Sequence, residues 1–427
     1  MKQNNTIRCL GPRLRGVSRM SLWTLALISS AGLCVTDSLA SPRSQVYGKV
    51  KTTSGDIYEG FIRWDRNEGA WDDVLEGTIN REATEQTDGD RKRRRRVRLF
   101  GLELHTKNGF YFSDGSVSAQ AAIAMGRLVA LERESDDYAT LTIKGGLEIE
   151  MEAEYTDLGS DVREIIVETA QDGEHEFAWD DIERVDFKAA PAGMKSDMGD
   201  RLYGTLSSRR GDSWTGHITW NASDIFSTDI MVGEVNDRRR KLRFGNIASV
   251  ERRGIDGALV TLHDSAELRL EESEEIGDGN TISVADPKLG RVTVDWDEFE
   301  KIVFSPEPDV IGYDSFGPSH PLRGIVTTAS GKQYTGEIIW DDDERYDWET
   351  LDGESRGVEI DIIFANIREI TKEGSRGVTV TLVDGRQIRL RGSNDVDDGN
   401  RGIFVRLDKR DVEEIDWDDF KSVKFTK

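Results

Sequence analysis

Acidic loops carry the side chains whose spacing comes closest to that of a metal site. Carboxylate oxygens are the ligands that calcium prefers, and one loop has to supply several of them. Two loops supply the candidate calcium ligands Asp395, Asp397, Asp398 and Asp278. In the first loop, counting back from Gly399 puts Val396 where a helix-loop-helix calcium site needs an oxygen ligand. The loops are therefore interpreted as polar hairpin turns, with a weak calcium site as the alternative.

Other cofactor or catalytic chemistry has little support in the sequence. The five histidines lack a second histidine or a cysteine at a zinc-binding spacing, and both cysteines, Cys9 and Cys34, fall near the N-terminus. No nucleophile elbow, phosphate-binding glycine loop or His-Glu-x-x-His motif is present. Carboxylate pairs abound among 81 acidic residues, so they do not by themselves identify a glycosidase. We expect no cofactor beyond weakly bound calcium, and we favour a non-catalytic protein.

Aromatic and basic residues supply the candidate binding groups. Trp71 and Trp348 stand beside acids and outside the alternating stretches, so they are candidates for surface binding or for anchoring a loop. A dense basic run supplies further candidates for contact with anionic material, namely Arg91, Arg93, Arg94, Arg95 and Arg96. Consecutive cations repel one another, so we expect this run to be exposed, with or without a partner.

One sequence pattern occurs three times and indicates that the chain is divided into repeats. It runs from an aromatic residue through glycine and isoleucine to tryptophan at 58–64, 214–220 and 334–340. Farther along, equivalent segments at 260–262 and 380–382 lie 120 residues apart. The chain is therefore predicted to contain three tandem repeats of about 120 residues each.

Within each repeat the apolar residues recur at every second position, which is the period of a β-strand. Tyr334, Ile338 and Trp340 share one face, and Trp64 and Trp220 have the same parity in their own repeats. This parity places the three tryptophans in the core and not on a carbohydrate-binding surface. Each repeat is predicted to be an all-β unit of roughly seven or eight strands.

The sequence pattern at the end of each predicted unit indicates a more specific fold class. A strand, a short capped turn and a second strand explain the apolar spacing at 360–370 and again at 415–425. This ending, together with the glycine-containing opening hairpin, resembles small Sm-like β-barrels. The resemblance implies that each repeat is a β-barrel or sandwich unit, or a pair of small Sm-like barrels. The RNA binding of that class is not carried over, because a net charge of −24 repels nucleic acid.

Composition and spacing also predict the domain boundaries. The expected organisation is a signal peptide at 1–40, β repeats at 46–187, 198–304 and 321–427, and linkers at 188–199 and 305–320. The linkers are recognised by their proline and glycine content. The first repeat is longer than the other two, which predicts an insertion at about 78–125.

The first forty residues read as a targeting segment. Cations precede an apolar run at 22–35, and small residues ending at Ala40 fit a signal-peptidase site. The apolar run is too short to span a membrane comfortably, and no later segment approaches the roughly 20 apolar residues that a membrane helix needs. We expect export to the periplasm or the extracellular space, with no transmembrane segment in the mature chain.

These features favour an exported, non-catalytic β-repeat protein that acts as a binding or scaffold module of the cell envelope or extracellular space. Repetition favours binding, because repeated surfaces gain avidity whereas an active site is usually built once. The expected partner is an envelope protein or polysaccharide, and not nucleic acid. Two alternatives remain, namely an envelope-glycan hydrolase that uses acidic residues and a calcium-stabilised adhesive protein.

Overall fold

The computed structural model describes residues 43–82, 98–99, 102–103, 116–153, 157–236, 238–271, 273, 275–408 and 411–426. The chain separates into two compact units, Met1–Leu39 and Ala40–Lys427, and the first lies outside the described residues. The predicted signal peptide at 1–40 and the basic run Arg91–Arg96 also lie outside them.

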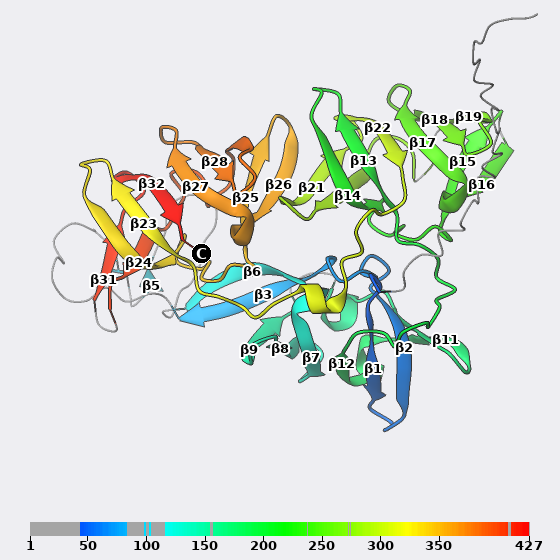
Figure 1. Ribbon diagram of the computed structural model, residues 1–427, viewed down its shortest axis with the longest axis horizontal. Coiled ribbons are helices and arrows are strands. Elements are labelled where there is room, and N and C mark those ends of the chain that lie inside the picture. The colour runs from blue at the N-terminus through cyan, green and yellow to red at the C-terminus, as the bar shows by residue number, and fades with distance from the viewer. Residues whose placement is uncertain are drawn as a thin grey trace, which may run out of the picture. The chain divides into compact units, whose positions relative to one another are not determined.

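The described residues form an all-β structure, as predicted (Figure 1). Their only helical elements are single 3₁₀ turns, namely η1 (Met125–Arg127), η2 (Gly159–Asp161), η3 (Trp179–Asp181), η4 (Phe244–Asn246), η5 (Tyr313–Ser315) and η6 (Phe364–Asn366). Alternation of apolar and polar residues explains this outcome, because it gives each strand one face for the core and one for water.

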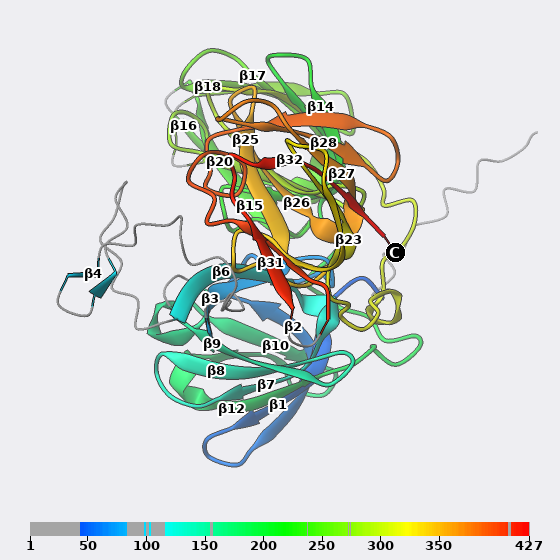
Figure 2. The same ribbon diagram turned by 90° about the vertical axis from the view of Figure 1, so that its left-hand side faces the viewer.

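Three large antiparallel sheets contain almost all of the strands. The first sheet has the order β11 (Gly173–Phe177), β10 (Ile165–Thr169), β2 (Ile57–Trp64), β1 (Tyr47–Thr52), β12 (Ile182–Phe187), β7 (Leu128–Arg133), β8 (Tyr138–Ile143), β9 (Leu147–Glu152), β3 (Val74–Glu82) and β6 (Ser116–Ala124). Figure 2 shows β12, β7, β8 and β9 next to one another in this sheet. A separate two-stranded sheet pairs β4 (Arg98–Leu99) with β5 (Leu102–Glu103).

The second and third sheets come from the remainder of the chain. The second has the order β16 (Arg238–Arg243), β15 (Ile230–Val235), β19 (Glu267–Glu271), β18 (Gly257–Leu262), β17 (Ile247–Arg252), β22 (Phe299–Phe304), β13 (Tyr203–Ser208), β14 (Ser213–Trp220), β20 (Thr281–Asp286), β21 (Gly290–Asp295), β26 (Val358–Ile363) and β25 (Thr350–Ser355). The third has the order β29 (Gln387–Leu390), β28 (Val378–Leu382), β27 (Ile367–Lys372), β32 (Phe420–Phe425), β23 (Arg323–Thr328), β24 (Gln333–Ile339), β30 (Ile403–Arg406) and β31 (Val412–Ile415).

The connectivity of the three sheets follows one plan. The residues of the three predicted repeats, 46–187, 198–304 and 321–427, are called the first, second and third segments. Each opening strand, β1, β13 or β23, lies between the strand that follows it and the last strand of its segment. The third segment differs from the others at its hairpin β25–β26, because β26 pairs with β21 of the second sheet, while β25 keeps a bridge to its own segment between Glu354 and Arg391. Among the described residues no sheet closes into a barrel, since the two end strands of each sheet do not pair with each other.

The predicted insertion begins and ends within a long hairpin. β3 and β6 pair over nine residues, from Val74 opposite Ala124 to Glu82 opposite Ser116. The corresponding hairpins β15–β16 and β25–β26 pair over six residues each. The predicted bounds 78–125 therefore include the ends of two paired strands.

Tryptophans form the centre of the core, as their parity predicts. Trp64, Trp220 and Trp340 are completely buried, each with 0% exposure. Each indole Nε1 donates to a backbone carbonyl of its own segment, at distances of 2.7, 3.1 and 3.0 Å. Each ring also packs edge-on against a second tryptophan near the end of its segment. Burial with a satisfied N–H makes these rings structural.

Of the two roles predicted for Trp71 and Trp348, surface binding or anchoring of a loop, the surface role is wrong. Their side chains are 0% and 3% exposed, and both belong to the core of the first sheet. Trp71 packs against Tyr313 of the second predicted linker, with ring centroids 4.7 Å apart, and Trp348 stacks on Tyr346. Neighbouring acids suggested exposure, but Asp73 faces inward, where its carboxylate accepts backbone N–H groups in a buried turn.

Two reciprocal ion pairs join the first and second segments. Arg63 of β2 contacts Asp229 at 2.8 Å, and Arg201 beside β13 contacts Asp73 at 2.7 Å. The Arg201 and Asp73 side chains are 1% and 7% exposed, so this pair is buried. Removing one partner of a buried pair leaves an uncompensated charge, which costs about 3–5 kcal/mol. These pairs fix the contact between the two segments.

A histidine adds a third connection between these segments. His217 of β14 is buried, and its Nδ1 lies 2.7 Å from Oδ1 of Asp72. Its Nε2 lies 3.5 Å from Oε2 of Glu307 in the second predicted linker. Burial alone would lower the pKa of His217, but the Asp72 carboxylate outweighs it and raises the pKa to about 9. The imidazolium therefore bridges three parts of the chain at neutral pH.

Candidate binding cleft

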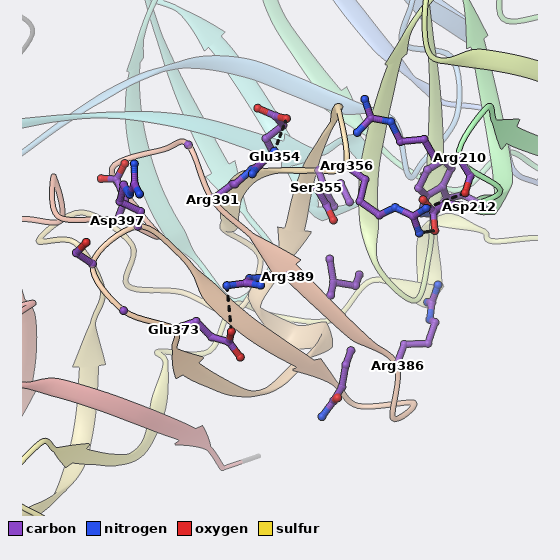
Figure 3. A pocket seen from close by; sticks show the side chains of 18 of the residues that line it. Arg210, Asp212, Glu354, Ser355, Arg356, Glu373, Arg386, Arg389, Arg391 and Asp397 are labelled. Atoms are coloured by element: carbon purple, nitrogen blue, oxygen red, sulfur yellow. Dashed lines mark hydrogen bonds and ion pairs between the residues drawn. The ribbon is translucent and has the colours of Figure 1, made fainter.

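A cleft of about 1240 Å³ lies between the second and third segments (Figure 3). The turn between β13 and β14 supplies part of its wall, and β25, β26, β29 and the turn after β27 supply the rest. Six arginines line it, namely Arg210, Arg356, Arg376, Arg386, Arg389 and Arg391. This is a concentration of guanidinium groups in a chain whose net charge is −24.

Local structure explains why these arginines point into the cleft. Arg356 occupies the turn of the β25–β26 hairpin with φ of 52°, and Gly357 follows with φ of 82°. Two successive residues with positive φ give the tight turn that suits the twist of the strands. In β29, alternation buries Leu390 in the core and turns Arg389 to the opposite, exposed face. The pairing of β26 with β21 then brings the second and third segments together.

Ion pairs hold most of the arginines in place. Arg389 contacts Glu373 at 3.3 Å, and Arg391 contacts Glu354 at 3.6 Å. Arg356 spans the two segments, because its guanidinium donates to Asp212 at 3.0 Å. These pairs are well exposed, with 70% exposure for Arg389, so each contributes only about 0–1 kcal/mol. An anionic ligand can therefore displace these carboxylates from the arginines at little cost in free energy.

The charge of the lining favours an anion. Four acids line the cleft with the six arginines, namely Asp212, Glu354, Glu373 and Asp397, and three acids outside the lining pair with Arg210 and Arg386, namely Glu298, Asp286 and Asp384. Arg376 is exposed and forms no ion pair among the described residues. Trp214, Ile360 and Ile388 supply an apolar floor. A guanidinium binds carboxylate or phosphate through two parallel hydrogen bonds, so the cleft can bind an anionic group and cover apolar surface beside it.

The predicted calcium ligands do not converge in the structure. Asp395 is buried, and its Oδ2 accepts the backbone N–H of Asp352 at 2.9 Å. Asp397 lies at the margin of the cleft, where its Oδ1 accepts the N–H of Gly399 at 2.8 Å. Asp398 and Asp278 are exposed in different segments. Within the described ranges, no three His, Cys, Asp or Glu side chains form a group that could hold a metal ion.

Buried carboxylates are a second feature that the sequence patterns did not reveal. One acid follows the core tryptophan of each segment, at Glu68, Asp224 and Glu344. Burial, with the nearby Asp157 carboxylate, raises the pKa of Glu68 well above its usual value. Burial and the Glu275 carboxylate raise the pKa of Asp224 to about 7. Carboxyl groups in water ionise near pH 4. Between about pH 4 and its raised pKa, each of these groups therefore stays protonated inside the protein.

The arginine cleft could not be found from sequence spacing, because its residues come from turns that lie far apart in the chain. A local signal does exist in β29, where Arg389 and Arg391 alternate with buried residues. The sequence analysis also missed a second basic run at 238–243, which forms a strand.

Comparisons of the chain with protein-family models, with curated proteins and with solved structures found no match. Among the described residues, no helix has the length and apolar character needed to cross a membrane.

Proposed function

We propose that the protein is an exported, non-catalytic β-repeat protein that binds an anionic envelope polymer in the arginine-lined cleft. The observation that carries the proposal is the gathering of six arginines around about 1240 Å³ of accessible space in an otherwise acidic chain. A field of negative charge repels polyanions in general, so a local basic cleft restricts them to one place. The ligand class is a polymer that bears carboxylate or phosphate groups.

The three segments act as copies of one unit in this proposal. Their common strand order, their equivalent hairpins and the repeated tryptophan-to-carbonyl hydrogen bond support this view. Four places have the strand, 3₁₀ turn, strand sequence expected of Sm-like units, around η1, η3, η4 and η6. We therefore infer that each copy combines two open units of Sm-like type, joined edge to edge.

A binding role agrees better with the cleft than hydrolysis does. A glycosidase needs one protonated carboxylic acid and a second carboxylate on either side of the scissile bond. Glu354 and Glu373 in the cleft each form an ion pair with an arginine, at 3.6 and 3.3 Å. Repetition of the unit adds avidity if an extended polymer contacts more than one copy.

Titration calorimetry with two defined polymers tests the proposal. Polygalacturonate supplies carboxylates and polyphosphate supplies phosphates, so the pair distinguishes the two anion types. The variant R376A/R389A should weaken binding of the preferred polymer about tenfold or more, because each charge-assisted hydrogen bond contributes about 1.5–3 kcal/mol. The affinity should also fall as salt is added.

A matched control variant distinguishes binding of the polymer in the cleft from nonspecific attraction of the polymer to surface cations. Arg269 in β19 and Arg368 in β27 are exposed and lie on strands away from the cleft lining. The variant R269A/R368A removes the same charge and should bind as the wild type does. Equal loss in both variants, or no binding of either polymer by the wild type at low salt, would refute the proposed function.

A further inference from the structure

The edge strand β16 is the most basic element of the described structure. Five of its six residues are cations, and all five are exposed, namely Arg238, Arg239, Arg240, Lys241 and Arg243. Only β15 pairs with it, since β16 is the end strand of the second sheet (Figure 1). In the part of the chain that the structure describes, none of the five forms an ion pair. Among the described residues these side chains therefore have no salt-bridge partner, although Glu234 of β15 lies directly opposite Arg239 in the strand pair.

A free sheet edge presents unpaired backbone N–H and C=O groups that can accept another strand. Charged side chains on the edge discourage unselective pairing. They also select a strand of opposite charge, because opposite charges directly across two strands are stabilising and like charges are destabilising. A strand with five cations thus fits an acidic partner strand.

The chain itself shows how the equivalent strand is paired. β26 stands in the third segment where β16 stands in the second, and it pairs antiparallel with β21. In that register Arg291 lies opposite Asp361, and its Nε donates to the carboxylate at 3.0 Å. β21 begins with Gly290, where an added Cβ would lie 2.0 Å from the carbonyl oxygen of Asp361. Close approach of the partner strand thus requires glycine there.

The counterpart of β21 in the first segment is β11, and its outer edge is free. β11 is the end strand of the first sheet and pairs only with β10. It begins with Gly173, as β21 begins with Gly290, and an added Cβ at Gly173 would meet nothing within 4 Å. Glu174 and Glu176 are exposed along the strand. β11 is therefore an acidic edge strand with room for a partner.

β31, the counterpart in the third segment, fits less well. Asp411 occupies the place that corresponds to Gly290, counted back from the closing tryptophans Trp417 and Trp296. The side chain of Asp411 would collide with an approaching strand. Gly173 has no side chain and leaves room for it.

We propose that β16 of one molecule pairs antiparallel with β11 of a second copy of this chain. The register of β21 with β26, transferred to β11 and β16, puts Glu174 opposite Lys241 and Glu176 opposite Arg239. Both pairs lie on the same face of the joined sheet, because residues two apart in a strand share a face. β11 and β16 do not pair within one molecule. Because the two surfaces differ, the contact links molecules head to tail into rings or open chains.

Charge exchange between two variants tests this contact. In R239E/K241E both proposed cross-strand pairs bring acid against acid, and in E174K/E176K both bring base against base. Each variant alone should remain monomeric in analytical ultracentrifugation at low salt, whereas the wild type should associate. An equimolar mixture of the two variants should associate again, since at both pairs an acidic residue then meets a basic one. R269E/R368E changes two exposed cations outside β16 and should associate as the wild type does.

Two results would overturn the proposal. A wild-type chain that stays monomeric up to about 100 µM at low salt has no such contact of useful strength. Association that persists in both reversed variants, or that the mixture fails to restore, places the contact elsewhere. Circular dichroism of each variant identifies a folding defect, and rescue by mixing is a result that misfolded chains would not give.

Discussion

Replacing Asp224 by asparagine should stabilise the protein above about pH 7 and leave its stability unchanged near pH 4. Burial, the nearby Glu275 and then Asp229 raise the pKa of Asp224 from 3.8 to about 7, against the opposing effect of Arg63. The folded state therefore keeps a proton on this carboxyl that the unfolded chain has already lost. Stability falls as pH rises from about 4 to about 7, and the ionised group is then a net cost.

The size of the effect follows from the same numbers. A tenfold change in proton affinity corresponds to about 1.4 kcal/mol, so a rise from 3.8 to about 7 corresponds to about 4 kcal/mol. Asparagine has nearly the same shape and no charge. D224N should therefore gain on the order of 4 kcal/mol at about pH 8 and nothing at about pH 4.

Urea denaturation followed by tryptophan fluorescence measures this difference at both pH values. D278N is the matched control, because Asp278 is exposed in the same segment and its neutralisation should leave the urea midpoint unchanged. A D224N variant that is no more stable than the wild type at about pH 8 would show that the carboxylate is stabilised in a way the structure does not explain.

Three further predictions concern the core, a buried histidine and calcium. Trp340→Ala should lower the free energy of unfolding by about 3–5 kcal/mol, because it empties a fully buried site and removes one of the two donors to the Asp395 carbonyl, and a near-neutral result in denaturation would contradict the core assignment. His217→Gln should destabilise the protein on the order of 3 kcal/mol below about pH 6.5, and the gap should narrow as pH rises through about 9, because only the imidazolium pairs with Asp72; a pH-independent gap in thermal melting would contradict this. Calorimetry should detect calcium binding with a dissociation constant of about 10⁻⁴ to 10⁻³ M or none, and tighter binding would mean that the ligands of one loop rearrange.

The fold class was predictable because the period of two is a local property of the sequence. Trp64, Trp220 and Trp340 could be placed in the core from the residues two and four positions away. Trp71 and Trp348 could not, because they stand in turns where side-chain direction does not alternate. Their burial depends on distant segments, such as the linker that brings Tyr313 against Trp71.

The candidate sites were less predictable, because each depends on which strands pair. Arg210 and Arg356 lie in one cleft only because β26 of the third segment pairs with β21 of the second. The run at Arg238–Arg243 has the composition of a solvated loop, yet pairing with β15 makes it a strand. Composition could reveal the charge of that run but not the free edge on which it lies.

Hydrogen–deuterium exchange with and without the preferred anionic polymer tests the central claim most directly. The account predicts slower amide exchange in the three turns that bound the cleft, at 209–212, 354–357 and 373–376, with R376A/R389A abolishing the effect. Unchanged exchange in those turns, or protection confined to β16 or to residues outside the cleft, would contradict it.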